Sequence, residues 1–153
     1  GDGVNAAINA GFNKIISIEL SDYYYNKSLN RFKNNNNIKL YHGDSIKVLP
    51  KILENIDDRC TFWLDGHFSG GNTACGDKPV PLREELNIIS KHKIKTHTIL
   101  IDDIRLLKNK TNEWSDLEYG LYNIIDLIKS INYNYIIDYI DGVEKNDILI
   151  AKI

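Results

Sequence analysis

The feature that most constrains the fold is an alternation of short apolar runs with segments of helical periodicity. Four compact runs rich in β-branched and aromatic residues come first, at residues 14–20, 38–42, 60–65 and 97–102. Between them, apolar residues recur at steps of three and four, the spacing of an amphipathic helix. Strands that alternate with helices predict βαβ units and a parallel sheet covered on both faces. We therefore expect an α/β fold, a three-layer sandwich built on a mostly parallel sheet.

The helical segments carry start signals of different kinds. Ser21 and Pro81 each precede an apolar stripe, and proline suits the first turn of a helix. Ser115 and Glu118 form an S-x-x-E capping box ahead of a further stripe. Pro50 interrupts its segment, because proline lacks the N–H group that a helix interior uses. There we expect a short turn and then a helix from about Pro50.

The C-terminal part has a different pattern. Residues 133–140 and 147–153 are two apolar runs with no room for a helix between them. The six residues that join them, 141–146, include Asp-Gly and other turn formers, which is typical of a hairpin. The otherwise parallel sheet should therefore end in an antiparallel pair of strands.

Composition limits the class of protein. A chain of 153 residues, 42% of them hydrophobic, is long enough for one domain with a sizeable core. A formal net charge of −2 gives no electrostatic reason to expect a nucleic acid or a membrane as partner, and no apolar run reaches the roughly 18 residues of a membrane span. Cys60 and Cys75 should be free thiols in a reducing, cytoplasmic compartment. The oligomeric state is left open.

Ionisable side chains stand at the ends of four consecutive predicted strands. In open α/β sheets, ligands bind beyond the carboxyl ends of the strands, so these side chains should share one edge. A single acid there would be an ordinary turn former, whereas a set of them indicates a site. The set is Glu19, Asp44, Asp65, His67, Asp102 and Asp103.

The first residues contain a glycine pattern. Gly1-x-Gly3-x-x-Ala6 fits the G-x-G-x-x-G/A fingerprint of nucleotide-binding loops, and Glu19 closes the next strand where a ribose partner belongs. The strand that should precede such a loop is absent from the sequence, which contains no methionine and begins at Gly1. The pattern is either a cofactor loop or a plain loop before a helix.

Together, GDGVNAAINAGFNKIISIEL, HGDS and FWLDGHFSGG resemble the class I S-adenosylmethionine-dependent methyltransferases. The resemblance covers nearly the whole chain, including the terminal hairpin. It implies a Rossmann-like sheet of seven strands whose last strand is inserted antiparallel. It also implies that the first strand is missing, so that residues 1–153 form a single, N-terminally incomplete methyltransferase-like domain.

The resemblance implies a set of cofactor-binding residues. Glu19 would accept hydrogen bonds from the ribose hydroxyl groups, Asp44 would accept one from the adenine amino group, and Asp65 would line the methyl-transfer pocket. From the residues alone, Glu19 and Asp44 could equally be caps of the helices that follow, and Asp65 a turn residue. The whole set is Gly1, Asp2, Gly3, Glu19, Asp44, Ser45 and Asp65.

The chemistry of methyl transfer suggests roles for Asp65 and His67 as catalytic residues. The acceptor, a small molecule or a sugar, must lose a proton if it reacts through a hydroxyl group. His67 could act as general base, since histidine changes protonation state near neutral pH. Alternatively, Asp65, Asp102 and Asp103 could hold Mg²⁺, which acidifies a bound hydroxyl. We favour the metal narrowly, because three carboxylates at one edge repel one another unless a cation compensates.

Two other functions fit parts of the sequence. The glycine pattern and Glu19 would suit an NAD(P)-dependent Rossmann oxidoreductase, although the hairpin and the HGDS segment argue against it. A non-catalytic interaction domain with a methyltransferase-like fold would be consistent with the missing strand. The polar, glycine-rich loop at residues 69–77 is well placed to close over an acceptor.

Overall fold

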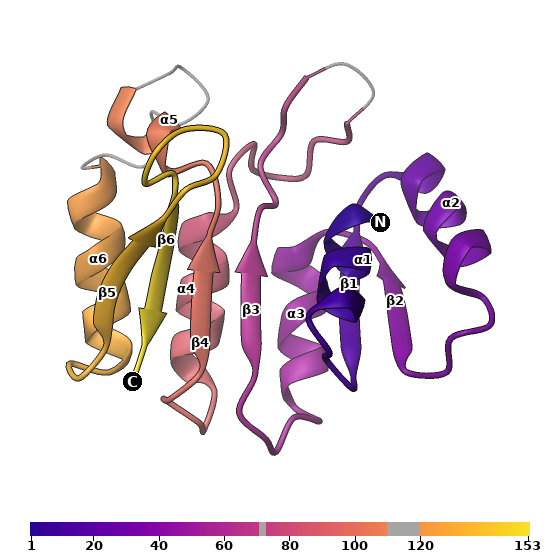
Figure 1. The fold of residues 1–153 in the computed structure, drawn as a ribbon, viewed down its shortest axis with the longest axis horizontal. Coiled ribbons are helices and arrows are strands. Elements are labelled where there is room, and N and C mark those ends of the chain that lie inside the picture. The colour runs from indigo at the N-terminus through magenta and orange to yellow at the C-terminus, as the bar shows by residue number, and fades with distance from the viewer. Residues whose placement is uncertain (71–72, 110–119) are drawn as a thin grey trace.

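The computed structural model describes residues 1–70, 73–109 and 120–153, and contains α-helices and β-strands in alternation (Figure 1). The helices are α1 Asp2–Asn9, α2 Asp22–Phe32, α3 Ser45–Leu53, α4 Leu82–Lys91, α5 Ile104–Asn109 and α6 Gly120–Ile131. The strands are β1 Ile15–Glu19, β2 Ile38–His42, β3 Thr61–Leu64, β4 Thr98–Ile101, β5 Ile136–Ile140 and β6 Ile148–Lys152. Each strand expected from the sequence is present, and the α/β class is confirmed.

The described strands form two sheets. β1 and β2 pair in parallel, and a four-stranded sheet has the order β3-β4-β6-β5. The expected C-terminal hairpin is confirmed, because β5 and β6 are antiparallel. The expectation of a mostly parallel sheet is wrong: β3 pairs in parallel with β4, but β6 lies antiparallel between β4 and β5. Since the short hairpin inserts its second strand next to β4, that one strand makes both antiparallel pairings.

Two apolar clusters hold these elements together. The larger lies between the four-stranded sheet and a layer of α3, α4 and α6, which Figure 1 shows behind the strands, and it includes the fully buried Leu86, Ile99 and Ile128. The smaller joins α1, β1 and α2 through Val4, Ile15 and Phe32. β1 contributes to both, because its partly buried residues 16 and 18 pack against the larger cluster. Among the described strands, no pairing joins the two sheets, and apolar packing connects them.

The other face of the four-stranded sheet has no helix over it within the described part of the chain (Figure 1). Large apolar side chains are exposed on its strands: Trp63 on β3 is 48% exposed and Ile136 on β5 is 62% exposed. β1 and β3, the facing edge strands of the two sheets, each pair on one side only. This part of the surface therefore combines open strand edges with uncovered apolar residues.

The helix starts follow local capping. The Ser21 hydroxyl accepts a hydrogen bond from Tyr24 N and caps α2, the helix expected after this residue. The prediction for α3 is wrong, because this helix begins at Ser45 and continues through Pro50. Asp44 Oδ1 accepts from Ile46 N at 3.0 Å and satisfies the first turn. A buried stripe at residues 49, 52 and 53 offsets the hydrogen bond that proline cannot donate.

Two further expectations concern the ends of helices. Pro81 stands at the N-cap of α4, one residue before its expected place in the first turn. The predicted capping box at Ser115 and Glu118 lies outside the described residues, and α6 is described from Gly120 onward. None of the described helices has the combination of length and hydropathy that crossing a membrane requires.

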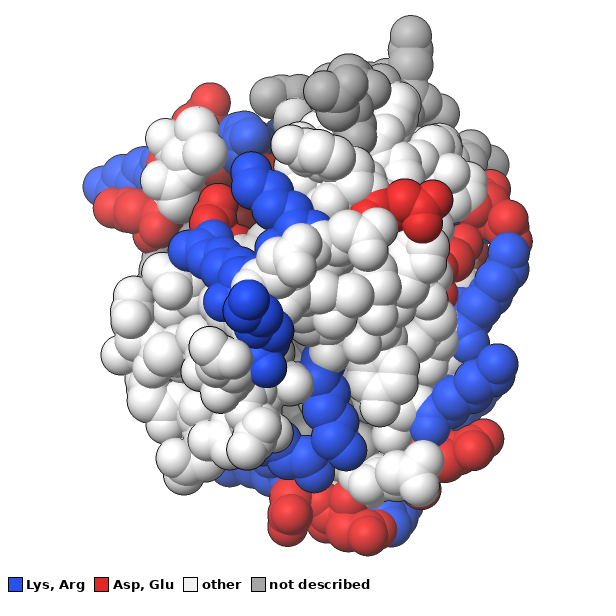
Figure 2. Space-filling view, turned by 90° about the vertical axis from the view of Figure 1, so that its right-hand side faces the viewer, with Lys and Arg blue, Asp and Glu red and all other residues white. Residues whose placement is uncertain are grey.

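Figure 2 shows the side of the molecule that carries α2 and β2. Lys and Arg side chains there lie among uncharged residues, and most of the visible Asp and Glu side chains lie toward the margins. One ion pair on the surface joins two elements of the smaller cluster, since Arg31 of α2 lies 2.8 Å from the Asp2 carboxylate of α1. Both side chains are largely exposed, so this pair contributes little to stability.

Candidate functional site

The parallel strands end beside a cavity of about 270 Å³, close to the lower limit of typical ligand pockets. It lies where β1, β2 and β3 pass into their following loops. In Figure 1 these strand ends point upward. Residues from three separate strand ends therefore meet around one space. The predicted site residues that line it are Glu19, Asp44, Ser45, Asp65 and His67.

Glu19 and Asp44 each make a local hydrogen bond at the start of a helix. Glu19 Oε1 accepts from Ser21 N at 2.8 Å, and Ser21 is itself the cap of α2. Asp44 is the N-cap of α3, so the interpretation of this residue as a cap is confirmed. Both side chains nevertheless line the cavity, and capping uses only Oδ1 of Asp44. A capping role and a ligand-binding role are therefore compatible.

The segment after residue 72 packs directly onto Asp44. Asp77 N donates to Asp44 Oδ2 at 3.3 Å, and Asp77 also pairs with Lys47 at 2.8 Å. A Cβ atom on Gly76 would lie 2.7 Å from Asp44 Oδ2, closer than such atoms are found. Glycine at position 76 is thus required for the contact between this segment and the turn before α3.

The structure places the N-terminal glycine pattern away from the cavity. Asp2 and Gly3 belong to α1 rather than to a loop, and neither they nor Gly1 line the cavity. A Cβ atom on Gly3 would meet nothing within 4 Å, whereas one on Gly1 would lie 3.0 Å from Ser28 Oγ. In this structure, therefore, these residues serve the start of α1.

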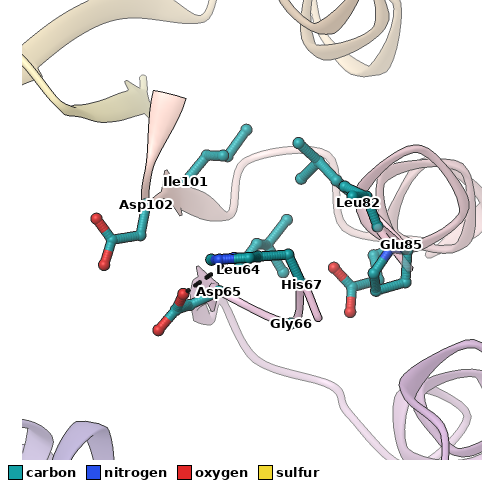
Figure 3. Close-up of a pocket in the computed structure, with 10 residues that line it drawn as sticks. Leu64, Asp65, Gly66, His67, Leu82, Glu85, Ile101 and Asp102 are labelled. Carbon is teal, nitrogen blue, oxygen red and sulfur yellow. Dashed lines mark ion pairs between the residues drawn. The ribbon is translucent and has the colours of Figure 1, made fainter. Parts of the chain in front are cut away.

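His67 lies between two carboxylates. Its Nδ1 is 3.7 Å from Asp65 Oδ1 and its Nε2 is 3.3 Å from Asp103 Oδ2. Figure 3 shows the Asp65–His67 pair at the end of β3. The Ser69 hydroxyl is also 3.1 Å from Nε2. The imidazole is largely buried, with 11% of the side chain exposed, so both acids act on it with limited screening by solvent.

Asp103 belongs to a second group of charges that the sequence patterns did not reveal. Arg105 forms ion pairs with both Asp103 and Asp147, and Asp147 is the residue before β6 in the terminal hairpin. Asp147 is 1% exposed, and its Oδ1 accepts from Arg105 N at 3.0 Å. Asp103 has a φ of 58°, a conformation that a non-glycine residue adopts rarely and that is often found at functional sites.

The ionised forms of Asp65 and Asp102 are destabilised at this edge of the sheet. Burial raises the pKa of Asp65, and the neighbouring Asp102 carboxylate raises it further. Burial likewise raises the pKa of Asp102, against the opposing effect of a hydrogen bond from Asp103 N to its Oδ1. Both carboxyl groups would consequently be stabilised by a positive charge placed beside them.

Within the described part of the chain, the donor atoms form two groups that could hold a cation. Asp65, His67 and Asp103 offer atoms within 4.8 Å of one another, and so do Asp102, Asp103 and Asp147. The predicted set of Asp65 with Asp102 and Asp103 is split between them. Arg105 already supplies positive charge to the second group. The first mixes an imidazole with carboxylates, a donor set that suits Mn²⁺ or Zn²⁺ better than Mg²⁺.

Among the predicted site residues, the structure thus brings Glu19, Asp44, Ser45, Asp65 and His67 to one cavity, with Asp103 in contact with His67. In comparisons with known proteins, the chain matches no protein-family model and no curated protein.

Proposed function

We propose that the chain is an S-adenosylmethionine-dependent methyltransferase domain that transfers a methyl group to a hydroxyl group of a small molecule or sugar. The observation that carries this proposal is the single cavity where Glu19, Asp44 and Asp65 meet from the ends of three strands. Ligands of open α/β sheets bind at this edge, and three acids there suit a ligand with a ribose, an amino group and a positive charge.

The residues present fit the two polar ends of an adenosine. Glu19 uses Oε1 for Ser21 N, so that Oε2 can accept from ribose hydroxyl groups. Asp44 holds its helix through Oδ1, and an adenine amino group would replace Asp77 N as the donor to Oδ2. When bound, the cofactor supplies a methyl group on a positively charged sulfur. Asp65 would stabilise that charge electrostatically.

We assign the proton transfer to His67. Asp103, 3.3 Å from Nε2, would orient the ring, and Nδ1, on the side of Asp65, would take the proton of the acceptor hydroxyl. The imidazolium ion that results would be stabilised by both carboxylates, as in other histidine–carboxylate pairs. A divalent ion held by Asp65, His67 and Asp103 is the alternative route, in which the ion acidifies the hydroxyl.

The proposal includes the finer architecture. β1–β2 and β3–β4 are both parallel pairs, and the edge strands β1 and β3 face each other across the middle of the molecule (Figure 1). One further parallel strand between them would join the two sheets into a Rossmann-like, three-layer sandwich. We place the activity in the cytoplasm, in line with the two unpaired cysteines.

The test is a thermal-shift titration of the full-length protein with S-adenosylhomocysteine and, separately, with NAD. We expect S-adenosylhomocysteine to raise the melting temperature in proportion to the logarithm of its concentration, and NAD to leave it unchanged. Asp44→Ala should abolish the shift, whereas the exposed Asp22→Asn should retain it. Stabilisation by NAD alone would indicate an oxidoreductase, and stabilisation by neither ligand would indicate a non-catalytic domain.

A further inference from the structure

Glu85 is an acidic residue at a position of α4 where the helical spacing of apolar residues predicts an apolar side chain. It lies on α4 in the same stripe as Leu82, Leu86 and Ile89, which are all buried in the larger apolar cluster. Its own side chain is also buried, with 5% exposed. Acids are almost never buried so completely unless something holds them. The contacts of Glu85 therefore bear on what this carboxyl group does.

The carboxyl group touches two turns of the candidate site. The side chain of Ser45, the first residue of α3, lies close enough to lower the pKa of Glu85 through hydrogen bonding. Glu85 Oε1 lies 3.2 Å from the position that a Cβ atom on Gly66 would take, so the backbone between Asp65 and His67 rests against it. Figure 3 shows Glu85 reaching from α4 toward this backbone.

A small cavity adjoins the same carboxyl group. Its volume is about 10 Å³, enough for one water molecule. The residues with polar side chains that line it are Asp65, His67, Glu85 and Asp102, and a buried water needs two to four polar partners. Glu85 is thus connected to the catalytic candidates both by direct contact with the turn and by a space suited to a bridging water.

The surroundings of Glu85 make its buried carboxyl group unfavourable for the stability of the fold. Burial raises the pKa of Glu85, and the charged groups that raise it further are Asp44, Glu84 and Asp65, all of them acids. The Ser45 hydrogen bond opposes this effect. A leucine in this stripe would bury apolar surface without the desolvation cost of a carboxyl group. Stability alone would therefore favour an apolar residue at position 85.

We propose that Glu85 is a positioning residue that fixes the Asp65–Gly66–His67 turn against the first turn of α3. This inference rests on the proposed function, since it assigns a role within the same site. Ser45 lies on the side where the cofactor's adenine would bind, and Gly66 lies between the two residues that face the acceptor. Glu85 thereby sets the distance between the two halves of the site.

The decisive variant is Glu85→Leu in the full-length protein. We expect a melting temperature equal to or above that of the wild type, because a buried acid is removed. Affinity for S-adenosylhomocysteine should change by less than about threefold, whereas kcat should fall at least about tenfold. In the ligand-free protein, the amide resonances of Gly66 and His67 should shift. Arg83→Gln, on the same turn of α4 but at an exposed position, is the matched control and should leave all four quantities unchanged.

Glu85→Gln separates positioning from acid–base chemistry. The amide has the shape of the carboxyl group and can still accept from Ser45, so kcat should stay within about threefold of the wild type. A tenfold loss in this variant would overturn the proposal, since it would show that the carboxyl group itself reacts. If Glu85→Leu does not fold, Glu85→Ala takes its place, with the same expected results for kcat and the resonances.

Unchanged kcat and unchanged Gly66 and His67 resonances in Glu85→Leu, or in Glu85→Ala if that variant is used, would also overturn the inference. The resonances distinguish its failure from failure of the proposed function. If the wild type does not bind S-adenosylhomocysteine, the proposed function is wrong, while the ligand-free spectra still decide whether Glu85 positions the turn.

Discussion

His92 Nδ1 and His97 Nε2 lie 2.8 Å apart in the interior, at the opposite end of β4 from the candidate site. His97 Nδ1 accepts from Cys60 N at 3.0 Å, and His92 Nε2 lies 3.0 Å from the carbonyl oxygen of Ile56. Only one arrangement of protons satisfies all three contacts: His97 donates from Nε2 to His92, and His92 donates from Nε2 to Ile56. Both imidazoles are therefore neutral, and a further proton on either would break a hydrogen bond.

This pair predicts a loss of stability in mild acid. Burial, together with the adjacent His92 and the nearby cations Arg59 and Lys95, lowers the pKa of His97 from 6.5 to about 4. The unfolded chain therefore binds a proton below pH 6.5 that the folded protein does not bind until about pH 4. The free energy of unfolding should therefore be unaffected by this histidine above pH 6.5. It should fall as the pH drops from 6.5 to about 4, by about 3 kcal/mol in total. Urea titrations of the full-length protein at intervals between pH 7 and pH 4 measure this directly.

His97→Gln is the control for that experiment, because other groups also titrate in acid. Glutamine can still accept from Cys60 N but takes up no proton, so the free energy of unfolding should depend less on pH between 6.5 and 4. The variant should also be less stable than the wild type at pH 7. Equal pH dependence of the two proteins would show that the histidine pair does not contribute.

Glu19 should contribute to cofactor affinity. Glu19→Ala is expected to weaken binding of S-adenosylhomocysteine by about 1–3 kcal/mol, because ribose hydroxyl groups would lose their acceptor. Isothermal titration calorimetry measures the change. Asp22→Asn, an exposed acid in the first turn of α2, should bind as the wild type does. If the affinity of Glu19→Ala is unchanged, the only role of Glu19 is its hydrogen bond to Ser21 N.

The two routes of proton removal give opposite results with a chelator. If His67 is the base, His67→Ala should lower kcat by about 10²-fold or more, a chelator should have no effect, and the rate should follow a single ionisation. If a divalent ion acts instead, the chelator and Asp65→Asn should both abolish turnover while S-adenosylhomocysteine still binds. Full activity in both His67→Ala and Asp65→Asn would show that neither residue takes part in catalysis.

The open edges of β1 and β3 predict self-association of residues 1–153 expressed alone. Unpaired N–H and C=O groups of edge strands recruit other chains, and the exposed Trp63 adds an apolar surface. Light scattering should show association that Thr61→Lys, on the edge strand β3, reduces. Tyr133→Lys adds the same charge at an exposed position away from that edge and should not reduce it. A monomeric, cooperative melt of residues 1–153 would contradict the prediction.

The strands could be predicted because their apolar runs are short and bounded by turn formers. Boundaries shifted where side chains compete with the ladder: β5 begins at Ile136, three residues later than expected, because Asn132 Oδ1 accepts from Asn134 N and forms a turn. The start of α3 was missed because the cap at Asp44 and the buried stripe outweigh one proline. Direction of pairing is not encoded in a strand's own pattern, so the balance of parallel and antiparallel pairs could not be predicted with confidence from periodicity.

The site was predictable only to the level of strand ends. The rule that ligands bind beyond the carboxyl ends of strands led to Glu19, Asp44, Asp65 and His67, which share the cavity. It could not reveal Arg105, whose partner Asp147 is 42 positions away. Glu85 did leave a signal, since an acid interrupts the apolar stripe of α4. Reading each polar residue in such a stripe as a possible contact of a site would have identified it.

The ion pair between Arg105 and Asp147 bears on local unfolding of the terminal hairpin. Its partner Asp147 is the residue before β6, so the ion pair fastens the terminal hairpin to the turn that holds Asp103. Ile104 N also donates to the Asp147 carbonyl oxygen at 3.0 Å. Any local unfolding that detaches the hairpin must therefore break the contacts of Ile104 and Arg105 with Asp147, and it leaves Asp103 as the remaining carboxylate partner of Arg105. We therefore expect the hairpin and the segment at Ile104 and Arg105 to open together, so that amide protons in both exchange with solvent through the same opening event.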